Sequence, residues 1–159
     1  MSGDSFSPVA AARALLARCG TGALATLSAD GQPFASFVTT APGEDGAPLL
    51  LLSQLAVHTR NLERDARASL LLVEPDETAS DPLARSRLTL TGIVGRAADQ
   101  ARARESFLAR HGKAAGYAGF ADFAFYRLAP AAGHLVAGFG RIAPIDPAAI
   151  LSDFPPSAG

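Results

Sequence analysis

Apolar residues follow two different spacings along the first third of the chain, one typical of helices and one typical of strands. Residues 8–18 are apolar at helical spacing, with Ser7 as the expected N-cap and Pro8 at the first helical position. Residues 21–28 alternate between apolar and polar, and a short turn leads into a second alternating run at 33–40. The pattern predicts an N-terminal helix followed by a β-hairpin.

Two short apolar runs enclose a polar segment in the next part of the chain. The runs are residues 48–52 and 68–73, and each has the length of a buried strand. The segment 53–67 between them carries serine, histidine, threonine, arginine and asparagine, and it predicts a tight turn followed by a short helix. The free N–H groups and the positive dipole end at such a helix start favour an anion, for example a phosphate.

A loop, a strand and a helix are predicted next. Residues 74–86 are acidic and contain proline, which indicates a loop long enough to have a function or to be a solvated excursion. Residues 87–97 alternate clearly and predict a strand, in which Gly92 marks a bend or a bulge. Residues 99–111 predict a helix, because Asp99 is a suitable N-cap and the apolar residues that follow have helical spacing.

The C-terminal part completes the pattern. The runs 121–128 and 134–145 predict two separate strands, and a short last helix is expected to start at 146–147. The total is six or seven strands in hairpin order with helices at the ends and in one crossover. This order predicts a mainly β fold with flanking helices, a small antiparallel barrel, in a single domain that spans residues 1–159.

Charge and composition limit the classes of function. The 14 basic and 15 acidic residues give a net charge of −1, which argues against a nucleic-acid footprint, since that requires a basic excess. The one cysteine, Cys19, cannot form an intramolecular disulfide. With no secretory leader and no long apolar run in the sequence, we expect a cytoplasmic protein without a membrane segment.

The candidate chemistry concentrates in the polar segment after the third predicted strand. Ser53, His58 and Thr59 cluster where the chain leaves a strand and enters a helix, which suits a phosphate. The alternative is that Thr59 or Ser53 caps the helix while His58 and Arg60 face the solvent. Motifs for a nucleophile elbow, a zinc protease, a phosphate loop or a dinucleotide fold are absent from the sequence.

Three more residues are candidates from their positions. Arg87 begins a predicted strand. Its guanidinium either points into a pocket, where it suits a phosphate or a flavin carbonyl, or lies on the surface at the strand end. Arg141 lies in GFGRI, where glycines on both sides of Phe139 permit a close approach to a ligand or to another strand. His134 is either an exposed axial ligand for a guest such as haem or an ordinary strand-end histidine. No histidine lies at ligand spacing from a cysteine or second histidine, so no intrinsic metal site is expected.

Three segments together resemble a known family. The segments SQLAVHTRNLERDARASLLL, DPLARSRLTLTGIV and LVAGFGRIAPID resemble the pyridoxamine-phosphate-oxidase-like flavoproteins, and most closely the branch that includes haem-utilisation proteins. The resemblance covers about residues 8–151. It implies an FMN-binding split β-barrel, an antiparallel Greek-key barrel of six to seven strands, with FMN held at the interface of a homodimer.

The resemblance also implies which residues contact the cofactor. Residues 36–39 are similar to the strand that runs along the flavin ring, and residues 52–53 to the strand end near the phosphate tail. His58 stands where the oxidases have a phosphate-binding lysine, and Arg87 stands where they have a glutamine. The implied cofactor contacts are Ser36, Phe37, Val38, Thr39, Leu52, Ser53, His58, Thr59 and Arg87.

Departures from the family narrow the expected activity. Ser36 replaces a phosphate-binding arginine of the oxidases, and their Arg-Leu-His substrate signature near the C-terminus is missing. Pyridoxamine phosphate oxidation is therefore not expected. The sequence also ends after the predicted barrel, without the additional C-terminal domain of the haem-utilisation proteins, which argues against haem degradation.

Two functions follow from the resemblance. The first is an FMN-dependent oxidoreductase of unidentified substrate, in which the flavin supplies the redox chemistry and the protein positions it. The alternative is a non-catalytic protein of the same fold that binds or stores flavin or haem. Because one fold hosts many functions, the sequence alone does not decide between them.

Overall fold

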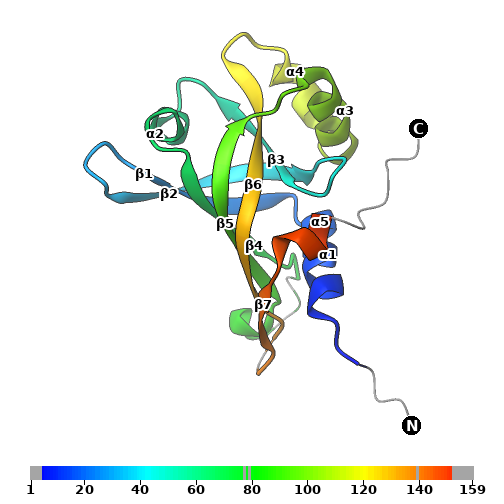
Figure 1. Cartoon of the computed structure of the whole chain (residues 1–159). Coiled ribbons are helices and arrows are strands. Elements are labelled where there is room, and N and C mark those ends of the chain that lie inside the picture. The colour runs from blue at the N-terminus through cyan, green and yellow to red at the C-terminus, as the bar shows by residue number, and fades with distance from the viewer. Residues whose placement is uncertain (1–4, 77, 79, 139, 152–159) are drawn as a thin grey trace.

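The structure is a computed structural model, and it describes residues 5–76, 78, 80–138 and 140–151. Its strands form one antiparallel sheet, and the barrel closes because β3 pairs with β6 as well as with β2 (Figure 1). The order is β3-β2-β1-β4-β5-β6-β7, with β7 added to one end of β6. The predicted mainly β barrel with flanking helices is confirmed. The strands are β1 (Thr21–Leu27), β2 (Pro33–Pro42), β3 (Pro48–Ser53), β4 (Arg67–Val73), β5 (Arg87–Arg96), β6 (Phe123–Val136) and β7 (Ile142–Ile145).

Helices cover parts of this barrel. In Figure 1, α1 and α5 lie together on one side, while α3 and α4 lie near the end of the barrel where β6 begins. Ser7 caps α1 through its hydroxyl, and Asp99 caps α3 through its carboxylate, as predicted. No helix in the described part of the chain is both long and apolar enough to cross a membrane. The helices are α1 (Pro8–Arg18), α2 (Val57–Arg64), η1 (Pro82–Ala84), α3 (Gln100–Arg110), η2 (Gly112–Ala114), α4 (Ala115–Ala118) and α5 (Pro147–Leu151).

The last two strands differ from the prediction. The chain from 123 to 136 is one continuous strand, and only the short β7 follows it. The prediction had two separate strands, 121–128 and 134–145, and the stretch between them contains Pro130, which cannot donate to a strand ladder. The pairing of β5 with β6 shifts between Thr91 and Gly92, so that Gly92 pairs with Pro130 and Thr91 with Ala132. This bulge accommodates the proline, and the bulge predicted at Gly92 is confirmed.

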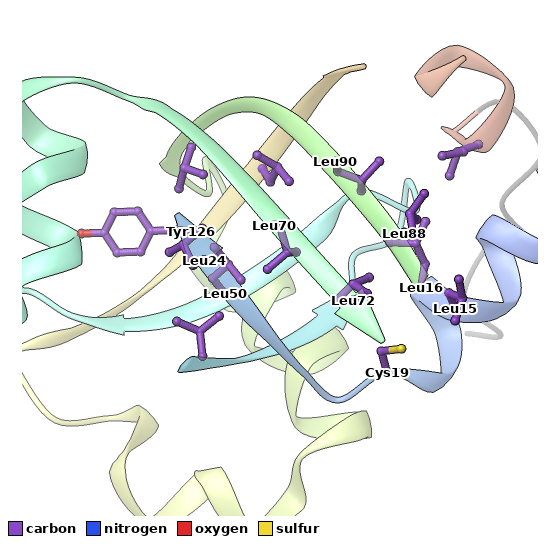
Figure 2. Close-up of a cluster of buried hydrophobic side chains, with 14 of the residues drawn as sticks. Leu15, Leu16, Cys19, Leu24, Leu50, Leu70, Leu72, Leu88, Leu90 and Tyr126 are labelled. Carbon is purple, nitrogen blue, oxygen red and sulfur yellow. The ribbon is translucent and has the colours of Figure 1, made fainter. Parts of the chain in front are cut away.

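The barrel interior is filled mainly by leucine. Figure 2 shows leucines of β1, β3, β4 and β5 pointing towards one another, with Leu15 and Leu16 of α1 closing one end. Leu24, Leu50 and Leu70 are completely buried in this cluster. A smaller cluster under α3 contains Phe107 and Phe125, whose ring centroids are 5.5 Å apart. The two apolar clusters fix the barrel and α3 relative to each other.

Candidate functional site

A surface hollow lies where α2 begins, between β2, β3 and the start of β6. Its volume is about 250 Å³. We call it the His58 hollow. Six of the nine predicted cofactor residues line it, together with neighbours that the prediction did not include. The lining residues are Phe37, Val38, Thr39, Leu51, Leu52, Ser53, Ala56, His58, Tyr117 and Phe123.

His58 contributes an imidazole to the lining of this hollow. It is half-buried in the first turn of α2, and its Nδ1 lies 3.0 Å from the Ser36 hydroxyl oxygen on β2. Burial lowers the pKa of the imidazole from its usual 6.5. When the Ser36 hydroxyl donates to the Leu24 carbonyl at 3.5 Å, the His58 Nδ1–H donates to Ser36. That arrangement leaves a lone pair on Nε2, as a metal-binding imidazole requires.

The two hydroxyls expected at a phosphate are held by the protein itself. Thr59 is completely buried, and its hydroxyl donates to the Ser53 carbonyl at 2.6 Å. The Ser53 hydroxyl donates to an Asp122 carboxylate oxygen at 3.0 Å and accepts from the Leu55 N–H at 3.2 Å. These bonds hold the start of α2 against β3 and β6. A carboxylate beside Ser53 also disfavours a phosphate there.

Exposed apolar side chains surround the hollow. Phe37 is 79% exposed. Tyr117 and Phe120, from α4 and the residues after it, pack against Phe123 in tilted and edge-on arrangements, with centroid distances of 5.3 and 6.5 Å. An apolar surface of this kind on a folded domain marks a ligand or partner site. Leu55 and Val57 extend it on either side of Ala56, at 68% and 54% exposure.

The α4 segment was missed in the sequence. No element was predicted between the helix at 99–111 and the strand at 121–128, but residues 112–118 form the short helices η2 and α4. The signal that could have found it is the spacing of three aromatic residues, Tyr117, Phe120 and Phe123, at intervals of three. Such spacing gathers side chains on one face of a helical turn.

Arg87 lies far from the hollow in one chain. It pairs with Val136 at one end of β6, whereas Ser53 pairs with Phe123 at the other end. The Arg87 guanidinium donates to the carbonyls of Leu83 and Arg85 at 2.9 and 3.2 Å. The structure therefore brings Ser36, 37–39, 52–53, His58 and Thr59 together but leaves Arg87 apart.

The other candidates also lie outside the hollow. His134 is exposed within β6, opposite Thr89. Arg141 stacks over the Phe6 ring at 4.8 Å, and Phe139 lies outside the described residues. Within the described ranges, no group of three histidine, cysteine, aspartate or glutamate side chains is placed to hold a metal ion. His58 is thus the lining residue with a nitrogen suited to a metal that arrives with a ligand.

Sequence comparison identifies relatives of this chain. The family model described as CREG, beta-barrel matches residues 6–151. The chain is 38% identical over 139 residues to the chloroplastic non-canonical heme oxygenase HOZ of Arabidopsis thaliana, with 84% of this chain and 41% of HOZ covered. It is 30% identical over 123 residues to the heme oxygenase HutZ of Vibrio cholerae, with 74% of this chain and 69% of HutZ covered. The chain thus spans less than half the length of HOZ.

Comparison of structures gives the same group of proteins. A heme binding protein from Mycobacterium smegmatis superposes with a TM-score of 0.87 at 37% identity, over 94% of this chain and 62% of that one. The solved structure of HutZ from Vibrio cholerae, which is described as a heme storage protein, superposes with a TM-score of 0.63 at 25% identity, over 79% of this chain and 91% of HutZ. The split-barrel fold and the likeness to the haem-utilisation branch are confirmed.

The predicted cofactor is wrong. FMN was expected from the likeness to flavoproteins, but these relatives are named for haem: an oxygenase in two organisms and a binding protein in a third. The geometry offers a physical reason for the error. The hydroxyls of Ser53 and Thr59, which a flavin phosphate would need, are engaged within the protein. The same barrel therefore does not imply the same cofactor.

Proposed function

The chain belongs to the CREG β-barrel family, and from that premise we propose that it is a haem-binding protein that holds haem in the His58 hollow. The observation that carries the proposal is a half-buried imidazole, aligned by Ser36, beside a surface rich in exposed aromatic and aliphatic side chains. A porphyrin is a flat apolar ring with a metal that imidazole binds well. The imidazole of His58 suits the metal, and the apolar surface suits the porphyrin ring.

The residues present fit haem better than they fit a flavin. Phe37 and Phe123 offer apolar surface to the porphyrin, and His58 offers a nitrogen for the iron. The iron would supply any redox chemistry, while this chain binds and orients the ring and excludes water from one face. Ser36 would act as a positioning residue, because its bond to Nδ1 sets the direction of the other nitrogen.

A hollow of about 250 Å³ is smaller than the roughly 300–1,000 Å³ of a typical ligand site, so it covers only part of a porphyrin. We infer that a second copy of the chain supplies the rest. One row of neighbours on the outer face of the sheet contains Phe37, Ala23, Leu71, Thr89 and His134 and carries no carboxylate, lysine or arginine. Two such faces would bury each other well.

In this arrangement, any role of Arg87 at the haem requires the second copy to bring it to the hollow. Sedimentation at micromolar concentration should give twice the protomer mass of 16.3 kDa. A purely monomeric protein would contradict the shared site.

The test of haem binding is a titration with hemin followed by visible absorbance. We expect wild-type protein to bind hemin with a saturating, shifted Soret band. His58→Ala should lose the shift and weaken binding by about 10- to 100-fold, and Ser36→Ala should weaken it less. The matched control is His134→Ala, which removes an exposed histidine outside the hollow.

The possible outcomes distinguish whether the protein binds haem from whether His58 is the residue that binds the iron. Hemin that fails to saturate wild-type protein would refute the proposed function. If His134→Ala abolishes the Soret shift while His58→Ala leaves it intact, haem binds but His58 is not its ligand. Circular dichroism of each variant shows that a loss of binding is not a loss of fold.

A further inference from the structure

A second cavity lies at the mouth of the barrel, where α2 meets β5 and β6. Its volume is about 180 Å³, and it shares no lining residue with the His58 hollow. We call it the Tyr126 cavity. Its lining combines apolar side chains with several that form hydrogen bonds. These residues are Gln54, Leu62, Glu63, Val94, Gly95, Arg96 and Tyr126.

The base of this cavity is a buried tyrosine. Tyr126 is 5% exposed and belongs to the leucine cluster of the barrel. Figure 2 shows its ring reaching out of that cluster, with the hydroxyl directed away from the leucines towards α2. Within the part of the chain that the structure describes, this hydroxyl has no hydrogen-bond partner. The ring is buried, whereas the hydroxyl remains open to the cavity, where a water molecule or a ligand can bond to it.

Opposite charges stand at the mouth of the cavity. Arg96 is the direct cross-strand neighbour of Tyr126, and Glu63 comes from α2. Both are exposed, and neither forms an ion pair with another residue in the described ranges. Burial raises the pKa of the Tyr126 hydroxyl, while Arg96 lowers it and Glu63 raises it, so both charges act on this group. The cavity therefore has a donor at its base and one charge of each sign at its rim.

We propose that the Tyr126 cavity is a binding site for a small zwitterion, a molecule that carries one carboxylate and one ammonium group. The carboxylate accepts a hydrogen bond from the Tyr126 hydroxyl and pairs with Arg96, and the ammonium group faces Glu63. A simple anion would be repelled by Glu63, and a simple cation by Arg96. A protein cavity of about 150 Å³ accommodates benzene, so this one has room for a small amino acid.

Haem is not required for this second site. The Tyr126 hydroxyl forms no hydrogen bond to another residue in the described part of the chain, so removing it should affect ligand binding but not stability. Tyr126→Phe should leave the stability of the fold unchanged, because it removes no hydrogen bond of the folded chain. The same change should weaken binding of the zwitterion.

The experiment is a titration of the full chain with glycine and with L-alanine, followed by NMR or by calorimetry. We expect saturable binding of both probes, about tenfold weaker in Tyr126→Phe, as for the loss of one hydrogen bond to a charged group. Arg96→Gln and Glu63→Gln should each weaken it too. Acetate and methylammonium, which carry one charge each, should bind more weakly than glycine. Tyr117→Phe is the matched control, because Tyr117 lines the His58 hollow instead.

Three results would overturn the proposal. The first is no saturable binding of either amino acid to wild-type protein. The second is equal binding by Tyr126→Phe, which would locate the ligand elsewhere or leave only an ordered water on the hydroxyl. The third is a clear loss of stability in Tyr126→Phe, which would mean that the hydroxyl already has a partner within the fold.

Discussion

The adjacent residues His58 and Thr59 were both predicted as cofactor contacts, but their side chains have different roles in the structure. Thr59 is completely buried and bonds to the Ser53 carbonyl, so its hydroxyl stabilises the start of α2. His58 faces the hollow and contacts Ser36 across the gap between α2 and β2. Helical neighbours point in directions about 100° apart, so one can serve the fold while the other serves a site.

At the same scale, the depressed pKa of His58 predicts a pH-dependent stability. The folded protein prefers the neutral imidazole, whereas the unfolded chain protonates near the ordinary value of 6.5. The unfolded state therefore binds more protons as the pH falls, and the contribution of His58 is complete above 6.5 and is lost as the pH drops below it. Urea unfolding between pH 8 and 5 should show this loss.

His58→Gln provides the comparison, because it removes the titrating group while keeping a polar side chain of similar reach. The difference in unfolding free energy between wild type and His58→Gln should change with pH in that window. A constant difference would contradict the burial of His58.

The sequence identified Ser53, His58 and Thr59 as candidates, but it did not determine the role of each side chain. Ser53 and Thr59 were candidates both for a phosphate and for a helix cap, and the structure places both hydroxyls in internal hydrogen bonds. The Asp122 carboxylate that holds Ser53 lies 69 positions away in the chain. A contact of that separation depends on the closure of the barrel, which local patterns do not contain.

At the scale of the elements, Gly92 is a position in β5 where the neighbouring strand leaves no room for a side chain. A Cβ at this residue would lie 2.1 Å from the Ala129 carbonyl oxygen, which is too close for any side chain. Gly92→Ala should therefore destabilise the protein by about 1–3 kcal/mol or more, because β6 must move at its bulge. Gly95→Ala, on the same strand, is the control, since a Cβ there meets nothing within 4 Å.

Thermal or urea unfolding measures both glycine variants. Equal stability of Gly92→Ala and Gly95→Ala would show that the bulge is not constrained as the structure indicates. The prediction of a bulge at Gly92 succeeded because a glycine inside an alternating strand weakens the strand and is typical of a bulge or a close backbone approach. The prediction of separate strands at 121–128 and 134–145 failed because β6 continues through Pro130, which the bulge at Gly92 accommodates.

At the scale of the whole molecule, the order of the elements was predictable. Hairpin spacing and capping residues located the helices α1 and α3 and the strands up to β5, and these imply an antiparallel barrel. The ligand was not predictable in the same way. One barrel can present similar strands to flavin or to haem, and the choice depends on which side chains remain free after folding.

The proposed haem site is incomplete in one chain. The His58 hollow covers part of a porphyrin, and the outer sheet face that begins at Phe37 lacks a covering layer in the described chain. A second copy on that face would complete the site and bury Phe37. Haem binding and dimer formation are then expected to support each other.

The measurement that tests haem binding at His58 most directly is the position of iron in crystals of the hemin complex, located by anomalous diffraction at the iron edge. We expect one iron peak per chain beside the His58 Nε2, with the porphyrin against Phe37. An iron peak elsewhere on the molecule, with the His58 hollow filled by solvent, would contradict the proposed site.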